Sequence, residues 1–279
     1  MSQTADLYCV MGHPVAHSRS PAIHTRFAAL TGEHLTYERR LLPLDGFAQG
    51  VREFAAQGGR GCNVTVPFKA EAPGLATVCS ERVQLAGAAN TLSFRADGSI
   101  HADNTDGLGL VADITRNAGV PLAGRDVLLV GAGGAAAGVL GPLLQAGVRH
   151  ITVANRTLAR AQALVQAHGA LAKLQNSELI AIDPQGLEAD FDVIINATAS
   201  SLAGAGVPVP AHVLRPGCLA YDMMYGPAAQ GFLDWARQHG AVPRDGLGML
   251  VEQAAEAFLL WRGVRPPSAQ VLQEMQQAA

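Results

Sequence analysis

The stretch that decides the fold is Arg125–Ala136, which reads RDVLLVGAGGAA. Its first half, up to Val130, is an almost wholly apolar run, typical of a parallel strand buried on both faces. Its second half, Gly131–Ala136, has the spacing G-x-G-x-x-A at the point where a helix is expected to begin. There the first glycine makes a tight turn, the second lets the backbone approach a pyrophosphate, and the small last residue lets helix and strand pack closely. A glycine-rich packing turn without a ligand remains the alternative on this motif alone.

Helix and strand patterns alternate downstream of this turn. A helix with buried positions at 139, 140, 143 and 144 precedes a second strand at Ile151–Ala154. Further strands are expected at Phe191–Ile195 and Cys218–Asp222. The chain from about 120 to 240 therefore reads as a βαβ series with a parallel sheet.

The flanking regions carry shorter patterns. We expect Ser20 to cap a helix that has Pro21 at its first position, and Asp45 to cap a second helix carrying Phe47, Val51 and Phe54. Residues 61–66 read as a strand that places Asn63 and Thr65 on one face, and residues after Asp106 as a helix with Leu108, Val111 and Ile114 inward. A long helix over 248–261 and a short one carrying Leu272 and Met275 end the chain.

These patterns predict an α/β chain of two domains. The expected first domain covers residues 1–106 and the second residues 107–240. Residues 241–279 are expected to return to the first domain, although the pattern alone does not establish that return.

Composition excludes several classes of protein. The chain has 279 residues, of which 49% are hydrophobic and 15% charged, which excludes intrinsic disorder. Its net charge is 20 − 23 = −3 without a basic stripe, which argues against a nucleic-acid surface. No apolar run is long enough to span a membrane, no signal peptide is visible, and nothing has metal-ligand spacing. The four cysteines show no CxxC spacing, so we expect reduced thiols in a cytoplasmic protein.

The end of the second strand indicates which dinucleotide is bound. It reads Ala154-Asn155-Arg156-Thr157, where an NAD-binding protein usually carries a carboxylate that bonds the ribose 2′-hydroxyl. Arg156 can instead pair with a 2′-phosphate, which favours NADP. A solvated Arg156 beside a plain helix cap remains the alternative.

Polar side chains gather at three places in the first domain. Ser18 and Ser20 precede or open a helix, where hydroxyls can seat a carboxylate. Lys69 lies four residues after Thr65, so that one strand end delivers an amide, a hydroxyl and an ammonium group. Asp106 stands at the start of a helix. Each has a plain alternative: a helix cap for Ser20 and Asp106, and a solvated surface lysine for Lys69.

Taken together in order, these motifs resemble the shikimate dehydrogenase family over essentially the whole chain. The segments that carry the resemblance are GHPVAHSRSP at 12–21, NVTVPFK at 63–69, ANT at 89–91, NTDG at 104–107, GAGGAA at 131–136, NRT at 155–157, NAT at 196–198, YDMMY at 221–225 and GLGMLVEQ at 246–253. The family has an N-terminal substrate domain, which includes the C-terminal helices, and a Rossmann-type NADP domain, with the site in the cleft between them. The resemblance implies NADPH-dependent, reversible reduction of 3-dehydroshikimate to shikimate, in the biosynthesis of chorismate and the aromatic amino acids.

The resemblance also implies a role for each matching residue. Lys69 and Asp106 would form the catalytic pair. The substrate would be held by Ser18 and Ser20 at its carboxylate and by Asn63, Thr65, Asn90, Tyr225 and Gln253 at its hydroxyls. The cofactor would be held at its pyrophosphate by Gly131, Ala132, Gly133, Gly134 and Ala135, at its 2′-phosphate by Asn155, Arg156 and Thr157, and on the nicotinamide side by Thr198, Met223, Gly246 and Met249.

Two departures from the family pattern touch the edge of this site. Thr25 stands where asparagine is common after His24, and Ala199–Ser201 replace a common Ser-Ser-Gly. Three rivals stay open: a paralogue acting on quinate, often with NAD; a non-catalytic NADP-binding protein; and a dehydrogenase of another substrate on a similar scaffold, such as the folate enzymes. The oligomeric state is expected to be a monomer or a homodimer.

Overall fold

A computed structural model describes residues 5–198 and 209–277 of the chain. The chain divides into two compact units, residues 1–109 with 250–279 (the first unit) and residues 110–249 (the second unit). It passes between them inside α4, Asp106–Ala112, and inside α8, Leu247–Arg262. Both passages lie later in the chain than the breaks expected after 106 and 240, because Leu110 and Met249 pack into the core of the second unit.

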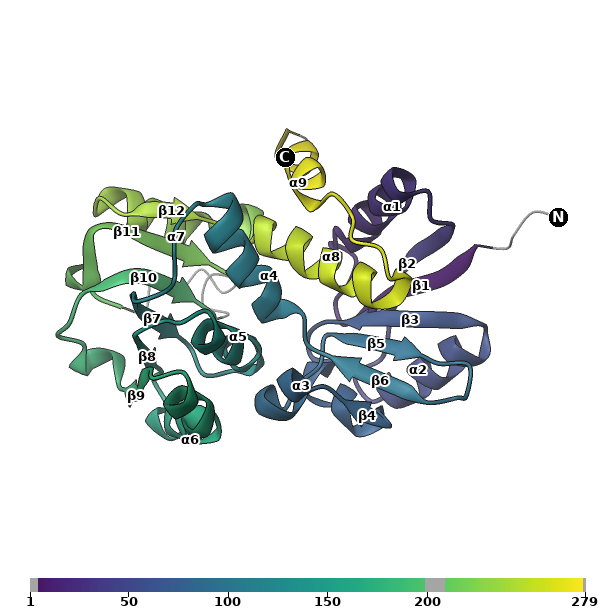
Figure 1. Cartoon of the computed structure of the whole chain (residues 1–279), viewed down its shortest axis with the longest axis horizontal. Coiled ribbons are helices and arrows are strands. Elements are labelled where there is room, and N and C mark those ends of the chain that lie inside the picture. Colours follow the sequence, from purple (N-terminus) through teal and green to yellow (C-terminus); the bar gives the residue numbers. More distant parts are fainter. Residues whose placement is uncertain (1–4, 199–208, 278–279) are drawn as a thin grey trace. The chain divides into compact units, whose positions relative to one another are not determined.

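The second unit is built on a sheet whose strands all run parallel (Figure 1). The strands stand in the order β12-β11-β10-β7-β8-β9, with β7 at Asp126–Val130, β8 at His150–Ala154, β9 at Glu178–Ile182, β10 at Phe191–Asn196, β11 at Leu214–Asp222 and β12 at Val242–Arg244. This is the doubly wound order of dinucleotide-binding sheets. The first strand, β7, lies centrally, and successive strands are added first on one side of it and then on the other.

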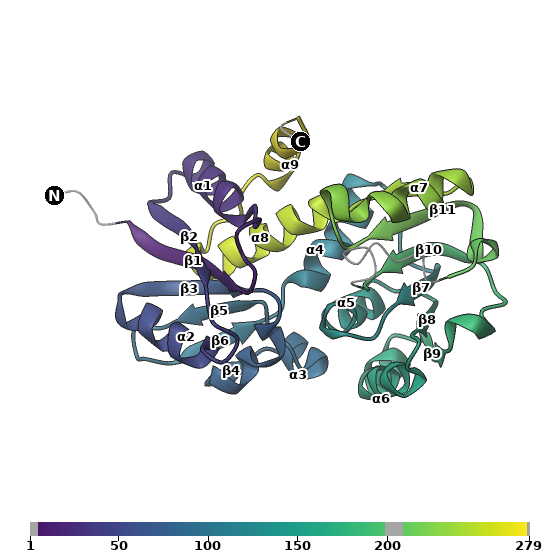
Figure 2. The ribbon, with the colours of Figure 1, turned by 180° about the vertical axis from the view of Figure 1, so that it is seen from behind.

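Helices cover both faces of this sheet. On one face α5, Gly134–Gln145, and α6, Leu158–Leu174, pack on alternate strand residues such as Val127 and Leu129. On the other face α7, Gln230–Gln238, packs on the intervening residues such as Leu128 and lies beside β11 (Figure 2). Because the residues of β7 from Val127 to Val130 meet apolar side chains on both faces, they form an unbroken apolar run.

The first unit is built on a mixed sheet. Its order is β2-β1-β3-β5-β6-β4, with β1 at Asp6–Gly12, β2 at Leu35–Leu41, β3 at Gly59–Val64, β4 at Val78–Cys79, β5 at Thr91–Phe94 and β6 at Ile100–Asp103. Strands β1, β2 and β3 are parallel, whereas β5 runs antiparallel to β3 and to β6.

The two faces of the mixed sheet differ in chemistry. One face packs on α2, Phe47–Ala56, and on α3, Glu81–Ala86, through aliphatic and phenylalanine side chains. The other face meets α1, Ser20–Thr31, and α8, where rings stack: His24 lies 4.2 Å from Tyr37 and Tyr8 lies 4.7 Å from Trp261, between ring centroids. A last helix, α9 at Ser268–Gln277, contacts α1.

The α/β class and the two domains are confirmed, but several local expectations are wrong. Ser20 is the first helical residue and not the cap, because the Ser18 hydroxyl accepts its N–H at 3.3 Å. Gly46, not Asp45, precedes α2. The strand expected over 61–66 ends at Val64.

The helix after Asp106 also differs from its prediction. It presents Leu110 and Ile114 as the fully buried positions, whereas Leu108 and Val111 are only half-buried. Beyond Ala112 the chain continues in a π-helical turn at Asp113–Asn117, which a regular helical period does not anticipate.

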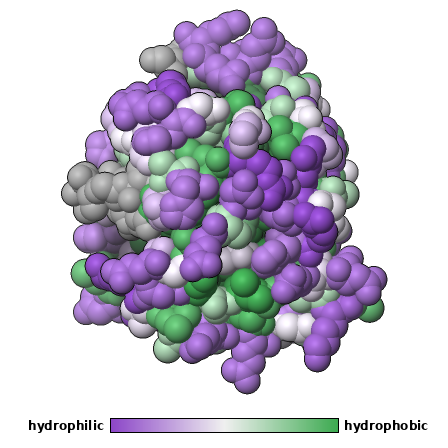
Figure 3. All heavy atoms as spheres, turned by 90° about the vertical axis from the view of Figure 1, so that its left-hand side faces the viewer, coloured by the Kyte–Doolittle hydropathy of each residue, from purple (hydrophilic) through white to green (hydrophobic). Residues whose placement is uncertain are grey.

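Hydrophilic side chains predominate on the face that Figure 3 shows, and hydrophobic ones form small patches between them. In the parts of the chain that the structure describes, every helix is too short or too polar to cross a membrane.

Candidate active site

Lys69 and Asp106 meet in the first unit, although 37 residues separate them. Lys69 lies in the short 3₁₀ turn Phe68–Ala70, and its Nζ is 2.6 Å from Oδ2 of Asp106 at the start of α4. The lysine side chain is 26% exposed and the carboxylate side chain 7%. The N–H of Asp106 donates to Asn104 Oδ1 at 3.1 Å, so the helix start is supported by Asn104. The carboxylate of Asp106 is therefore directed at the lysine and not at its own helix.

Asn90 connects this pair to Gln253. The Asn90 amide nitrogen lies 2.9 Å from Asp106 Oδ1 and 3.2 Å from Gln253 Oε1. Thr105, which sequence reasoning quoted in a motif but gave no role, reaches Asn90 at 2.9 Å and Gln253 at 3.4 Å. All of these side chains except Lys69 are buried, and they form one polar cluster inside an otherwise apolar unit.

Asn63 and Thr65 were expected on one face of a strand, and the structure separates their surroundings. Thr65 lies just beyond β3, half-buried, with its N–H bonded to Met11 O at 2.9 Å. A Cβ at Gly12 would collide with the Thr65 methyl, so that glycine is what lets Thr65 approach β1. Asn63 is buried, and its amide nitrogen already donates to Asn90 O at 3.1 Å and to Thr91 Oγ1 at 3.0 Å. The Asn63 oxygen accepts the Tyr37 hydroxyl at 2.7 Å, so only the second lone pair of that oxygen is left for a ligand.

Ser18 and Ser20 lie together at the start of α1. Ser18 is half-buried and Ser20 buried. The Ser18 carbonyl accepts two bonds from the Arg39 guanidinium, at 2.6 and 2.9 Å, which fixes the loop before the helix. Of the two departures from the family pattern, Thr25 is exposed on α1, and Ala199–Ser201 lie outside the described residues.

The glycine turn of the second unit fits a dinucleotide. Gly131 has φ +111°, and a Cβ there would lie 3.2 Å from Ala197 O. Gly133 and Gly134 have open space where a Cβ would stand, and no side chain caps the start of α5. Free N–H groups of a first helical turn, facing open space and carrying the positive end of the helix dipole, suit a pyrophosphate.

Arg156 is exposed at the end of β8 and has no ion-pair or hydrogen-bond partner among the residues that the structure describes. Its neighbours are shaped locally: Asn155 donates to Thr157 O at 2.8 Å, and Thr157 precedes α6 without capping it by its side chain. The plain helix cap that stood as the alternative is therefore not supplied by the Thr157 side chain. Both the guanidinium and the Thr157 hydroxyl remain available to a phosphate.

Thr198, Met223, Gly246 and Met249 all belong to the second unit. Thr198 Oγ1 donates to Asn196 Oδ1 at 2.8 Å, and the Asn196 amide donates to Asp222 at 3.0 Å, which ties the ends of β10 and β11 together. A Cβ at Gly246 would collide with the Met223 carbonyl. Met249 is buried in the same core cluster against which Met223 packs. Tyr225, expected to bind substrate, is half-buried and also lies in this unit.

A buried ion cluster that sequence reasoning missed supports this region. Asp113 is fully buried and receives the Arg244 guanidinium at 2.6 and 2.7 Å and the Tyr221 hydroxyl at 2.8 Å. Burial and the adjacent carboxylate raise the pKa of Tyr221 well above its usual value. A Cβ at Gly248 would collide with the same carboxylate, so the turn between β12 and α8 is held against the π-helical turn. No local pattern reveals a contact across 131 residues.

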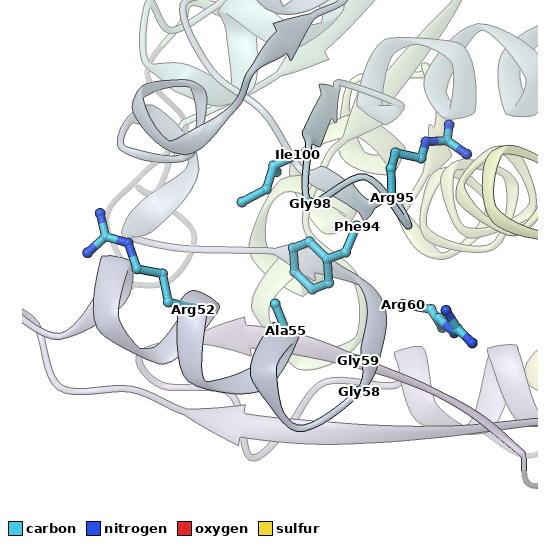
Figure 4. A pocket seen from close by; sticks show the side chains of 9 residues that line it. All are labelled: Arg52, Ala55, Gly58, Gly59, Arg60, Phe94, Arg95, Gly98 and Ile100. Atoms are coloured by element: carbon cyan, nitrogen blue, oxygen red, sulfur yellow. The ribbon is translucent and has the colours of Figure 1, made fainter.

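A separate hollow of about 440 Å³ lies in the first unit and contains none of the expected site residues. Phe94, Ala55 and Ile100 form its apolar lining, and the side chains of Arg52, Arg60 and Arg95 point away from the Phe94 ring (Figure 4). Within the described ranges, no three His, Cys, Asp or Glu side chains gather closely enough to hold a metal ion.

The strand order and the glycine turn define the second unit as a dinucleotide-binding domain of the Rossmann type. Three family models match the chain: the shikimate dehydrogenase substrate binding domain over residues 10–92, shikimate / quinate 5-dehydrogenase over 113–204, and the shikimate 5′-dehydrogenase C-terminal domain over 246–276. The chain belongs to the shikimate dehydrogenase family, as the sequence motifs predicted.

Relatives and solved structures agree with this assignment. The chain is 80% identical to shikimate dehydrogenase (NADP(+)) of Verminephrobacter eiseniae, over 100% of this chain and 97% of that one. It is similar to the crystal structure of an Ael1 enzyme from Pseudomonas putida, with 47% identity, a TM-score of 0.89 and coverage of 97% and 98%. It is also similar to shikimate 5-dehydrogenase from Thermus thermophilus in complex with NADP(H) and shikimate, with 32% identity, a TM-score of 0.85 and coverage of 98% and 100%.

Proposed function

We propose that this chain catalyses the NADPH-dependent, reversible reduction of 3-dehydroshikimate to shikimate, a step toward chorismate and the aromatic amino acids. The observation that carries the proposal is the Lys69–Asp106 pair at 2.6 Å, in a chain that is 80% identical to a shikimate dehydrogenase (NADP(+)).

The proposed chemistry assigns the proton to this pair. Interconversion of a secondary alcohol and a ketone moves one proton at the substrate oxygen, and NADP, when bound, supplies or takes up the hydride. Lys69 Nζ holds the proton that passes to or from that oxygen. Asp106 Oδ2 is in direct contact with the ammonium group and orients it. The limited exposure of the carboxylate strengthens this ion pair by excluding water.

The first unit supplies the proposed substrate contacts. Ser18 and Ser20 bind the carboxylate at the start of α1, where hydroxyls and free backbone N–H groups favour an anion. The ring hydroxyls are bound by Thr65, Asn90 and Gln253. Tyr225 is carried over to the same role from the family motif alone. Asn63 contributes through its oxygen, because both of its N–H groups are used within the unit.

The second unit supplies the proposed NADP contacts. The turn from Gly131 to Ala135 binds the pyrophosphate, and Asn155, Arg156 and Thr157 bind the 2′-phosphate. Thr198, Met223, Gly246 and Met249 lie on the nicotinamide side. The open space at Gly133 and the unpaired guanidinium of Arg156, among the residues described, support this assignment.

An assay of the purified chain tests the proposal. Formation of reduced cofactor is followed with shikimate or quinate, each with NADP or NAD. We expect the highest kcat/KM with shikimate and NADP. Higher kcat/KM with quinate or NAD would favour the paralogous activity, and no turnover with any pair would favour a binding protein without catalysis.

We further propose that the protein works in the cytoplasm as a monomer or homodimer, with small molecules as its partners. All four cysteines, Cys9, Cys62, Cys79 and Cys218, are free thiols, and all but Cys79 are buried, which suits a reducing compartment. Light scattering after size exclusion gives the oligomeric state, and cell fractionation gives the location.

A further inference from the structure

A row of buried hydrogen bonds begins at Tyr37 in β2. The Tyr37 hydroxyl donates to Asn63 Oδ1 at 2.7 Å, and Asn63 Nδ2 donates to Thr91 Oγ1 at 3.0 Å. The Thr91 hydroxyl then donates to Asn90 Oδ1 at 2.8 Å. All four residues are less than 9% exposed, so water cannot replace these partners without opening the unit.

The row continues to the proposed catalytic pair. Asn90 Nδ2 donates to Asp106 Oδ1 at 2.9 Å, and Lys69 donates to Asp106 Oδ2 at 2.6 Å. Five consecutive hydrogen bonds thus lead from β2 to the lysine. The first four have ordinary lengths, and the Lys69–Asp106 contact at 2.6 Å is shorter.

Two backbone groups set the direction of the whole row. The carbonyl of Asn90 can only accept, and it faces Asn63 Nδ2 at 3.1 Å, so Asn63 Oδ1 must face Tyr37. The N–H of Thr105 can only donate, and it faces Asn90 Oδ1 at 2.9 Å, so Asn90 Nδ2 must face Asp106. The Thr91 hydroxyl accepts a hydrogen bond from Asn63 and therefore donates its own hydrogen to Asn90.

We infer that Thr91 and Tyr37 are positioning residues for the reaction, which fix the Asn90 amide so that its N–H meets Asp106 Oδ1 and leaves Oδ2 to Lys69. This inference rests on the proposed function. Neither residue touches the lysine or the carboxylate, and both act through Asn90.

The fold alone does not require the Thr91 hydroxyl. The backbone of Thr91 provides its pairing with Asn63 in β3 and with Asp103 in β6. Valine has nearly the same shape and a high preference for strands, so it keeps the backbone pairing of Thr91. It removes a buried partner of Asn63 and of Asn90, so the melting temperature is measured beside kcat. Tyr37 likewise has its ring held by stacking on His24, independently of its hydroxyl.

The test compares Thr91→Val with Thr91→Ser. Valine keeps the shape but removes the donor to Asn90, and we expect kcat with shikimate and NADP to fall about tenfold. Serine keeps the donor, and we expect kcat within about twofold of the unsubstituted enzyme while the melting temperature falls, because a buried methyl is lost. Tyr37→Phe, two bonds further away, is expected to lower kcat by only about twofold to fivefold.

Thr152→Val is the matched control. Thr152 is a buried strand threonine in the second unit whose hydroxyl meets His150 at 3.2 Å, far along the chain from the row. We expect no change in kcat. Equal losses for the valine and serine variants at position 91, or full activity of Thr91→Val, would overturn the inference.

A combination of variants separates positioning from general damage. If Thr91 acts through Asn90 on Asp106, Thr91→Val should change kcat by less than about twofold once Asp106→Asn is present. Independent effects that multiply would show that Thr91 acts elsewhere.

A measurement without substrate keeps this inference distinct from the proposed function. The side-chain amide protons of Asn90 are followed by nitrogen-resolved NMR, and we expect them to shift in Thr91→Val and hardly at all in Thr91→Ser. An enzyme inactive with shikimate would refute the proposed function, while unchanged Asn90 signals in Thr91→Val would refute the positioning row.

Discussion

The two sheets of this chain place polar groups in opposite ways. In the second unit the strands are mostly apolar, and the groups proposed to bind cofactor stand where the strands end, as at Gly131 after β7 and Arg156 after β8. In the first unit the middle of the sheet carries buried polar side chains, such as Asn63 in β3 and Thr91 in β5. Under the proposed assignment, a dinucleotide meets backbone N–H groups at an edge, whereas a small polyhydroxy acid meets side chains from within the sheet.

This difference predicts which kind of substitution damages the proposed site in each unit. The cofactor turn depends on the absence of side chains, because Gly131 and Gly133 must let other groups come close. The substrate site depends on the presence of side chains that satisfy one another. Substitutions in the first unit should therefore affect kcat first, and substitutions in the second should affect cofactor binding first.

The largest expected effect is that of Lys69→Ala. Loss of the proton-transfer group should lower kcat by roughly 10²–10⁴-fold with a smaller change in KM. The chain contains only one other lysine, Lys173, which is exposed in α6 and serves as the matched control. Steady-state kinetics of Lys69→Ala and Lys173→Ala decide the matter, and a near-native kcat for Lys69→Ala would remove that residue from the mechanism.

A second prediction sets two glycines of one turn against each other. Gly131→Ala forces a side chain into φ +111° and close to Ala197 O, and should destabilise the second unit by about 1–3 kcal/mol. Gly133→Ala has an extended backbone and open space, so it should leave stability nearly unchanged but weaken NADP binding. Thermal unfolding with and without NADP measures both, and equal melting temperatures for the two variants would contradict the assignment of the turn.

The third prediction concerns cofactor choice. Arg156→Ala should raise KM for NADP, with a loss of about 1–3 kcal/mol, and leave the kinetics with NAD nearly unchanged. Because Arg156 is exposed, the loss should shrink as salt is added. Arg160→Ala, exposed in the first turn of the helix α6 that follows Arg156, is the control. Constants that worsen equally for both cofactors would exclude Arg156 from phosphate binding.

The smallest effect at neutral pH is an acid sensitivity of the first unit, which develops only as the pH falls. His24 is buried, neither ring nitrogen has a partner in the described structure, and burial lowers its pKa to about 3. The unfolded chain binds this proton near pH 6.5 and the folded chain does not, so stability falls by about 1.4 kcal/mol for each pH unit below that value until about pH 3.

Replacement of His24 by phenylalanine tests this sensitivity. His24→Phe keeps a ring against Tyr37 but cannot titrate, so its stability should depend less on pH across this window. Urea unfolding at several pH values measures it. The prediction fails if both proteins lose stability in parallel on acidification.

The second unit was the easier of the two to predict from sequence. The strand at 126–130 and the glycine turn are consecutive, and Arg156 follows 20 residues after the turn; each carries its signal in its own residue types. Buried polar side chains in these strands are few, namely Thr152, Asn196 and Asp222, so apolar runs mark most of the strands.

The first unit was harder to predict from sequence because its contacts join residues that are distant in sequence. Lys69 reaches Asp106 across 37 residues, and only a family resemblance brought the two together beforehand. Tyr37 lies in an ordinary alternating strand, and no local pattern indicates its hydrogen bond to Asn63, 26 residues away. In the second unit, the ion pair of Asp113 and Arg244 was not predicted for the same reason. The π-helical turn was not predicted because helical periodicity assumes a regular helix.

The buried thiols make the local opening of each unit measurable. Cys9 and Cys62 lie in the first unit and Cys218 in the second, and burial raises the pKa of Cys9 and brings that of Cys218 to about 12. A thiol in this state reacts with an alkylating reagent only when its surroundings open. The labelling rate at each cysteine, read by peptide mass, therefore reports how often each unit opens, with the natural sequence intact and no probe introduced.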